Sequence, residues 1–492
     1  MIFQKKEQID KKKFMISEEK KRKFLLEGNL WKVILYVTFP ITIYLVFQAI
    51  FNSYDIFLLR KKLKIDDELV SSINRIHLLK DIFISFGASI ATAGVILVGR
   101  NYGRKNLEKM RLYLSQTFVL TIIIGLIIAI LCTVFFKTLI LEHIVNYQGN
   151  KQEDLKKYYL IIFCSLVCII INIVFLALER AKGNNKIVLW VTLSNIAIKI
   201  ILSLVFFEIK NQMKSLAWAT LIAHASVTLF TFWFLFLNQK NYLKIFSKKF
   251  RFDKIFLKNL FTLSIPICIS IIVFNLGKII ISMVVKTNYD DGTNIDAQLV
   301  LAVSVNNIFF NIINSFADSQ NTIISQNLGQ KKMNRVFETF KKIIILIVLL
   351  AFVGTLIHLF CYGKILYLMT GENYHNLACA SDTKTQSAAF RILFFYETTG
   401  LWLTCFSIIL CSFFVCFKKT KIALNMNLLR IISGIFFLFL FSAPIFSSFN
   451  EVHKVGFSLF LGNLICFITT LSFFIPFYRK TKKENTTYED KI

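Results

Sequence analysis

The sequence predicts an all-α integral membrane protein of about twelve spanning helices, and two observations support this fold class. Of the 492 residues, 55% are apolar and the mean hydropathy is +0.61, more than one soluble core with a polar shell would hold. Twelve stretches also have the length of about 20 residues that a spanning helix needs. A membrane barrel would alternate apolar and polar residues, whereas Thr121–Ile130 reads TIIIGLIIAI. The stretches begin near Trp31, Ile76, Leu112, Tyr158, Ile187, Leu216, Leu260, Leu299, Ile343, Ala388, Ile422 and Val455.

The formal net charge of +29 lies mainly in alternate connections between these stretches. The connections 100–111 and 240–258 are strongly basic, whereas 287–296 carries three aspartates. Because basic loops stay on the cytoplasmic side, both chain ends are expected to be cytoplasmic, in a multi-pass protein of the cell membrane. The connection 60–75 fits this pattern poorly, since it should face outward yet mixes basic and acidic residues. A single basic face for nucleic acid is not indicated.

The first 30 residues are basic, and a full spanning stretch follows them without a small-residue cleavage site. They are therefore expected to form a partly disordered cytosolic tail and not a cleaved signal peptide. The expected divisions of the chain are a tail at 1–30, an N-lobe of helices 1–6 at 31–240, a basic cytoplasmic linker at 241–258, a C-lobe of helices 7–12 at 259–478 and a second cytosolic tail at 479–492.

The chain contains an internal repeat. VTFPITI (37–43) recurs as LSIPICI (263–269), and VGRNYGRK (98–105) recurs as ISQNLGQK (324–331), both at an offset of 226 residues. A further pair, Lys186-Ile187 and Lys421-Ile422, has an offset of 235. Each half then holds six spans, an even number, so the two halves have the same orientation and form a parallel repeat.

Two features of this repeat predict local structure. Pro40 and Pro266 each lie early in the first helix of a half, and an Asn-x-Gly sequence ends each second helix. We expect Gly103 and Gly329 to cap those helices in the left-handed conformation.

The first half has the pattern of a known family. Pro40 is followed fifteen residues later by Asp55, then by a glycine-rich helix and the loop Gly99-Arg-Asn-Tyr-Gly103-Arg-Lys. With twelve spans in a six-plus-six repeat, this resembles the multidrug and toxic compound extrusion (MATE) transporters, within a superfamily that includes lipid and oligosaccharide flippases.

The resemblance implies two parallel six-helix lobes around a central V-shaped cavity. It implies a monomeric antiporter without cofactor, which exports organic cations or amphiphilic drugs against an entering H+ or Na+ in the lipid bilayer. A flippase of lipid-linked or amphiphilic substrates with the same fold is the alternative. An ATP-driven pump is not indicated, because Gly99–Lys105 lacks the spacing of a phosphate-binding loop, and enzyme signatures such as HExxH and GxSxG are absent from the sequence.

The acid of the first half is the leading candidate site residue. Ionisable groups inside spans are costly and often functional, and by resemblance Asp55 is the carboxylate that couples transport to a proton or a sodium ion. Gln48 and Asn52 precede it at helical spacing and could line the cavity or bond neighbouring helices. In the alternative interpretation, the helix ends near Leu59 and Asp55 is an ordinary solvated acid near the outer interface.

The fifth span carries a second candidate pair. Asn195 matches a family asparagine near the acid, and Lys199 stands where some members have aspartate. Because residues four apart share a helix face, both are expected to face Asp55. We hypothesise an Asp55–Lys199 pair with which an entering cation competes; the alternative is a static or snorkelling lysine. This departure puts a sodium site near Asp55 in doubt.

The second half has its own charged residues within spans. Glu397 in the tenth span lies where some family members place an acid. Lys278 and Arg430 are deep cations, and His224 lies in the middle of the sixth span. The sequence favours a structural role for these three, although cations that line the cavity would favour anionic substrates.

Overall fold

The computed structural model describes residues 19–63, 67–135, 137–145, 151–210, 213–237, 252–289, 295–370, 386–446 and 448–489. Within this part of the chain, twelve helices are long and apolar enough to cross a membrane, and no strand is found. The predicted fold class and the number of spans are therefore confirmed. The helices start at or before the residues expected from the sequence, by ten residues in the ninth span.

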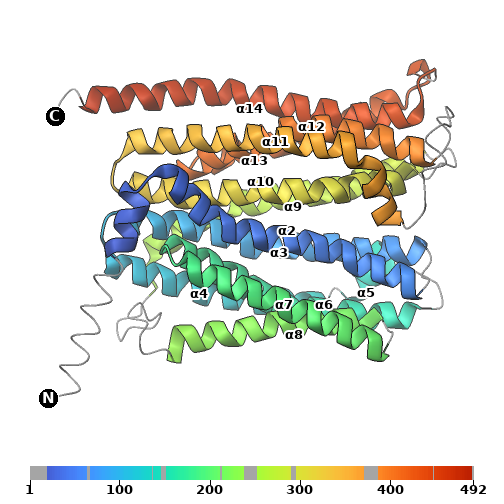
Figure 1. Cartoon of the computed structure of the whole chain (residues 1–492), viewed down its shortest axis with the longest axis horizontal. Helices are drawn as coiled ribbons and strands as arrows, with labels where there is room; N and C mark the ends of the chain where they lie inside the picture. The colour runs from blue at the N-terminus through green and yellow to red at the C-terminus, as the bar shows by residue number, and fades with distance from the viewer. Residues whose placement is uncertain are drawn as a thin grey trace. The chain divides into compact units, whose positions relative to one another are not determined.

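Long helices make up both halves of the repeat (Figure 1). Helix α2 extends to Leu63, beyond the end near Leu59 considered above. In the first half the helices are α2 (Leu30–Leu63), α3 (Asp67–Gly103), α4 (Leu107–Ile130), α5 (Lys137–Leu139), α6 (Gln152–Ala181), α7 (Asn185–Lys210) and α8 (Met213–Phe232), with π-helical turns η1 (Leu131–Phe135), η2 (Ile140–Val145) and η3 (Trp233–Leu237). In the second half they are α9 (Lys254–Asn288), α10 (Ile295–Gly329), α11 (Met333–Thr370), α12 (Gln386–Cys416), α13 (Thr420–Phe441) and α14 (Glu451–Glu489), with a short 3-10 turn η5 (Pro444–Phe446).

The chain forms two compact units. The first comprises Met1–Cys268 and Asp318–Thr339, and the second comprises Ile269–Ala317 and Phe340–Ile492. In the first unit α6 packs against α3, α4 and α8, and in the second α14 packs against α12 and α13. The domain boundaries expected from the repeat stay a prediction, because they follow chain order whereas these units follow packing.

Each unit has an apolar core built from several helices. In the first, residues of α4, α6, α7 and α8 pack around Phe118 and Phe175. In the second, residues of α9, α10, α12, α13 and α14 surround Phe390 and Tyr289, whose hydroxyl donates a hydrogen bond to the Leu438 carbonyl. Since lipid is as apolar as these side chains, close packing and buried hydrogen bonds hold such helices together.

The helix ends correct one prediction. Gly103 and Gly329 do not have positive φ; the left-handed residues are Lys105 (φ 63°) and Lys331 (φ 61°), two positions further on. Each lysine follows a helix that ends in a Schellman motif, in which two backbone N–H groups return to the last free carbonyls. The bonds are Lys105 N to Tyr102 O, Asn106 N to Asn101 O, Lys331 N to Leu328 O and Lys332 N to Asn327 O.

The same motif ends α6 and α12. There the left-handed residues are Gly183 (φ 79°) and Lys418 (φ 64°). They are 235 positions apart, as Lys105 and Lys331 are 226 apart, so the structure repeats at both offsets found in the sequence. The internal duplication therefore extends to the backbone conformation of the loops.

The two glycines have a different task, which is close packing within the first unit. A Cβ at Gly103 would meet the Gln326 carbonyl oxygen, and a Cβ at Gly329 would meet the Arg100 carbonyl oxygen. The two copies of the repeated loop motif thus contact each other, and only a residue without a side chain allows this approach.

The segment 19–27 is helical and is fixed by residues far along the chain. Arg335 donates from Nη2 to the carbonyls of Gly28 (2.6 Å) and Leu25 (3.3 Å), and Lys332 lies 3.4 Å from Glu27. The Leu25 side chain is buried beside Gly183. Part of the expected N-terminal tail is therefore an ordered element of the first unit.

Candidate functional site

The residues predicted around Asp55 are described in part. Asn52 and Asp55 belong to α2, but their side chains lie outside the described part of the structure, so the Asp55–Lys199 pair and a sodium site near Asp55 stay predictions. Gln48 is half-buried on the same helix. Asn195 is half-buried on α7, and its Oδ1 is buried without a hydrogen-bond partner.

Lys199 belongs to a basic group of side chains in the first unit. It acts electrostatically on His77 and His224, as does Lys80 of α3. Lys80 Nζ lies 3.2 Å from His77 Nδ1, and His77 Nε2 lies 3.0 Å from the Tyr158 hydroxyl. Because an ammonium can only donate, Nδ1 accepts and the ring donates from Nε2 to Tyr158. Sequence analysis did not select Lys80 and His77, because they follow closely on the connection 60–75, whose mixed charges are typical of a loop.

Glu397 on α12 lies among the deep cations of the second unit. Arg430 and Lys278 both act electrostatically on its carboxylate. Both cations also lie over one aromatic ring, with Lys278 Nζ 4.6 Å and Arg430 Cζ 4.9 Å from the centroid of Phe274. Phe310 stacks on the same ring at 5.8 Å. The structure therefore brings Glu397, Lys278 and Arg430 into one group, although they are far apart in the sequence. Cation–π contacts with Phe274 stabilise both cations.

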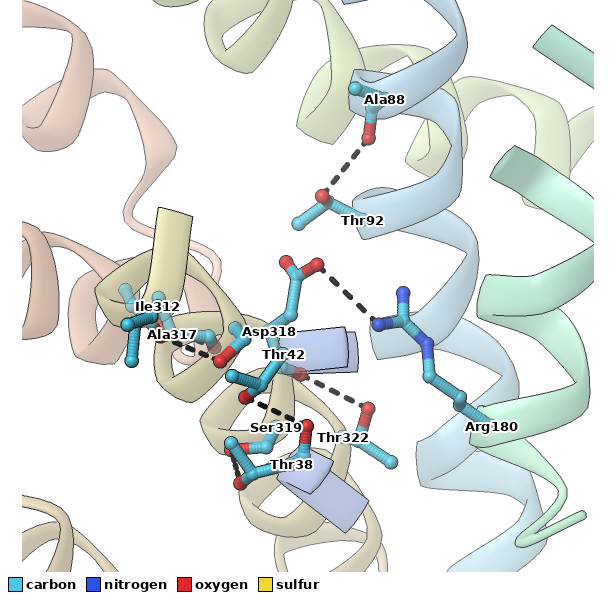
Figure 2. Close-up of polar contacts among 12 residues, drawn as sticks. Thr38, Thr42, Ala88, Thr92, Arg180, Ile312, Ala317, Asp318, Ser319 and Thr322 are labelled. Carbon is cyan, nitrogen blue, oxygen red and sulfur yellow. Dashed lines mark hydrogen bonds and ion pairs between the residues drawn. The ribbon is translucent and has the colours of Figure 1, made fainter. Parts of the chain in front are cut away.

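A further charged pair in the first unit was not predicted. Arg180 Nη1 of α6 lies 3.6 Å from Asp318 Oδ2 of α10 (Figure 2). The Arg180 side chain is 11% exposed and that of Asp318 is 38% exposed. Asp318 lies within the candidate span Gln298–Gly329, and Arg180 lies at the end of the span Gln152–Ala181; ionisable groups inside spans are functional candidates by default. This rule could have identified Asp318 from the sequence. Arg180 was not singled out because a basic residue in the last turn of a helix is common.

Hydroxyl side chains of α2 and α10 form hydrogen bonds near Asp318 in the sequence and the fold. Thr38 donates a 2.9 Å hydrogen bond to the Ser319 hydroxyl, and Thr42 donates to the Thr38 carbonyl at 3.1 Å (Figure 2). Thr322 donates to the backbone carbonyl of Asp318 at 3.1 Å. The bond between Thr38 and Ser319 joins α2 to α10, and the other two lie within their own helices.

The described chain is thus a polytopic membrane protein with ionisable groups in the spans of both units. A family model described as MatE matches residues 40–205 and 266–440, which together make up more than half of the chain. The two matches begin at Pro40 and Pro266, the equivalent prolines of the repeat. The chain belongs to the MatE family of multidrug transporters.

Solved structures show the same fold. An outward-facing multidrug resistance MATE transporter of the MOP superfamily has a TM-score of 0.80 at 16% identity, over 92% of this chain and 96% of that one. A MOP superfamily transporter from Pyrococcus furiosus, in which reverse polarity of the binding pocket suggests a different function, has a TM-score of 0.81 at 16% identity with the same coverage.

A relative is also found among curated proteins. The probable multidrug resistance protein YoeA of Bacillus subtilis (strain 168) is 24% identical over 260 residues. This match covers 51% of the chain and 55% of the relative, so the chain aligns with about half of that protein's length.

Proposed function

We propose that this chain is a secondary active transporter that exports amphiphilic small molecules in exchange for an entering cation. The observation that carries the proposal is the set of ionisable side chains inside the spans of both units, Glu397 with its two cations and Asp318 with Arg180. Such groups are costly in a membrane and are retained where ions or substrates pass. The multidrug resistance assigned to the Bacillus relative by its name supports drugs as the substrate class.

The energy for export is available from one coupled charge. Moving one elementary charge through 100 mV yields about 2.3 kcal/mol. At about 1.4 kcal/mol per tenfold change in concentration, this supports a gradient of about fiftyfold. One titrating carboxylate is therefore sufficient for useful efflux, and several charged pairs are not required.

Aromatic rings and charge in the second unit suit an amphiphile with rings and a polar group. Phe274 and Phe310 present stacked rings, and Glu397 and the two cations present both signs of charge. The Glu397 carboxylate would bind an organic cation, the substrate class that the resemblance implies. Lys278 and Arg430 would instead bind an acidic group of the substrate.

The alternative is a flippase for lipid-linked or amphiphilic substrates. The specific observation in its favour is that two cations, Arg430 and Lys278, act on the Glu397 carboxylate, so that positive charge suited to an anionic head group lies in this part of the second unit. The reverse polarity of the binding pocket in the Pyrococcus transporter supports the view that pocket charge varies among proteins with this fold.

The test is transport by the purified protein in liposomes. Accumulation of rhodamine 6G is measured by fluorescence under an imposed proton or sodium gradient, for wild type and Glu397→Gln. We expect accumulation under one gradient and its loss in the variant, because the amide no longer presents a negative charge to the cationic probe. Glu153→Gln is the matched control, since Glu153 is 82% exposed at the start of α6.

The two functions give different results in this assay. A folded wild type that accumulates no probe under either gradient contradicts export of this class. Fluorescent phospholipid or a lipid-linked anion is then offered to the same vesicles, and gradient-independent movement across the bilayer would establish the flippase.

A further inference from the structure

Asp318 occupies a particular place in the chain. Helix α10 belongs to the second unit as far as Ala317 and to the first unit from Asp318 onward. Asp318 and its partner Arg180 of α6 therefore both belong to the first unit.

The internal repeat shows that the fold does not require this charge. At the offset of 226 residues Asp318 corresponds to Thr92 of α3. The Thr92 hydroxyl donates to the Ala88 carbonyl of its own helix at 3.0 Å (Figure 2). At the offset of 235, Arg180 corresponds to Val415. A neutral hydroxyl and an apolar residue therefore fill the related positions, so the ion pair is a specific addition to one copy.

The geometry of the pair leaves it open to a competitor. The N–O distance of 3.6 Å exceeds that of an N–H···O hydrogen bond, and one carboxylate oxygen is involved. Arg180 Nε is buried without a hydrogen-bond partner. A buried pair offsets its desolvation only with excellent geometry and further hydrogen bonds. Here the guanidinium is almost fully buried while the carboxylate is 38% exposed, so the acid is the accessible member.

The side chains around the carboxylate favour one competitor. Among the described residues, Arg180 of α6 is the charged group that acts on Asp318, and Tyr44 of α2 is a titratable group that acts on Arg180. Hard metal ions take about six or more oxygen ligands, whereas the described part of the chain has no group of three or more His, Cys, Asp or Glu side chains that could hold a metal. A proton needs a single carboxylate oxygen.

We propose that Asp318 binds the coupling proton of this transporter and that Arg180 is its positioning residue. This rests on the proposed function, whose coupling ion it names. The ionised carboxylate pairs with Arg180. A proton entering from outside binds Asp318, ends the pairing, and leaves to the cytoplasm when the pair forms again.

The transport test compares three proteins, wild type and two variants, in liposomes with a pH gradient of about one unit, which supports about tenfold accumulation for each coupled proton. Rhodamine 6G is the probe, and a trapped pH-sensitive dye reports proton movement. We expect Asp318→Asn to lose the gradient-driven accumulation and the associated proton flux, whereas Glu153→Gln retains both. Wild-type accumulation driven by sodium alone, or by protons equally well in Asp318→Asn, overturns the proposal while the transport function stands.

The double variant Asp318→Asn with Arg180→Gln separates coupling from folding. Removing one member of a buried pair leaves an uncompensated charge and destabilises, whereas removing both does not. If the pair is only structural, the double variant folds and recovers proton-driven accumulation, which overturns the proposal. If Asp318 carries the proton, the double variant folds but still lacks proton-driven accumulation.

A second measurement needs no transported compound. Infrared difference spectra of the purified protein, titrated between about pH 5 and pH 9, report protonated carboxyl groups through their C=O stretch. We expect a band present in wild type and absent from Asp318→Asn. If wild type moves no probe, this band still decides whether Asp318 titrates, and its absence from wild type overturns the proposal independently of the transported substrate.

Discussion

The ends of α6 and α12 have the same backbone turn and opposite side-chain chemistry. In α6 the N–H of Asn184 bonds the Glu179 carbonyl at 2.9 Å, and in α12 the N–H of Lys419 bonds the Phe414 carbonyl at 2.9 Å. Each turn continues through a left-handed residue, Gly183 or Lys418. The duplicated chain thus preserves its backbone hydrogen bonds while the side chains have diverged.

The α6 end buries charge, whereas the α12 end buries aromatic rings. Glu179 (1% exposed) pairs with Lys182 (2% exposed) and accepts a 2.7 Å hydrogen bond from Asn184. At the equivalent place Phe414 packs against Phe477, with ring centroids 5.2 Å apart. The turn therefore does not dictate its surroundings, and buried charge in the first unit is a local property that mutation can separate from the fold.

The largest expected effect follows from breaking the buried ion pair at α6. Glu179→Ala leaves the Lys182 ammonium buried without its carboxylate, which is expected to cost about 3–5 kcal/mol. The measurement is the thermal unfolding midpoint in detergent, followed by tryptophan fluorescence. The control is the double variant Glu179→Leu with Lys182→Met, expected to recover most of the loss. Equal losses in the single and double variants would mean that the carboxylate acts by packing and not by charge.

The aromatic end is expected to be somewhat less sensitive. Phe414→Ala removes a fully buried ring and leaves a cavity, with an expected loss of about 3 kcal/mol. The matched control is Phe436→Ala, because Phe436 is 58% exposed on α13. The same unfolding assay is used. A loss at Phe436 as large as at Phe414 would show that ring contacts within α12 and α14 are not the stabilising feature.

The smallest effects concern the left-handed residues themselves. Gly183→Ala should destabilise by about 1–2 kcal/mol, because φ is 79° and the new Cβ would lie 2.6 Å from Leu25 Cδ1. Lys418→Gly should instead stabilise by up to about 1 kcal/mol, because glycine adopts positive φ without strain. Unfolding midpoints that change with the same sign in both variants would contradict the equivalence of the two turns.

The twelve helices and the repeat could be predicted because apolar length and recurring motifs are local properties of the sequence. The predicted left-handed caps at Gly103 and Gly329 were wrong because glycine is favoured both at left-handed caps and at close backbone contacts. The sequence does not distinguish these two roles, whereas the structure does. Here lysines accept the strained conformation, at the negative end of the helix dipole where a cation is favourable.

The candidate site was less predictable. Glu397, Lys278 and Arg430 could be selected as charges inside spans, but their common neighbour Phe274 could not. Arg180 and Asp318 are far apart in sequence, and they meet only because α10 packs with the first unit over its second part. Hydrophobic periodicity indicates which face of a helix is buried, but not which helix covers it.

The clamp of Arg335 on the segment near Leu25 has a consequence for synthesis of the protein. The two residues are 310 positions apart, so the N-terminal segment cannot reach its final position until the chain has been made as far as α11. At about 5–20 residues per second, this takes about 15 to 60 s. Before then Leu25, which is buried in the finished protein, has its contact at Gly183 available, but the segment lacks the two hydrogen bonds from Arg335. These bonds are therefore completed late in assembly, after the α10–α11 connection has been made.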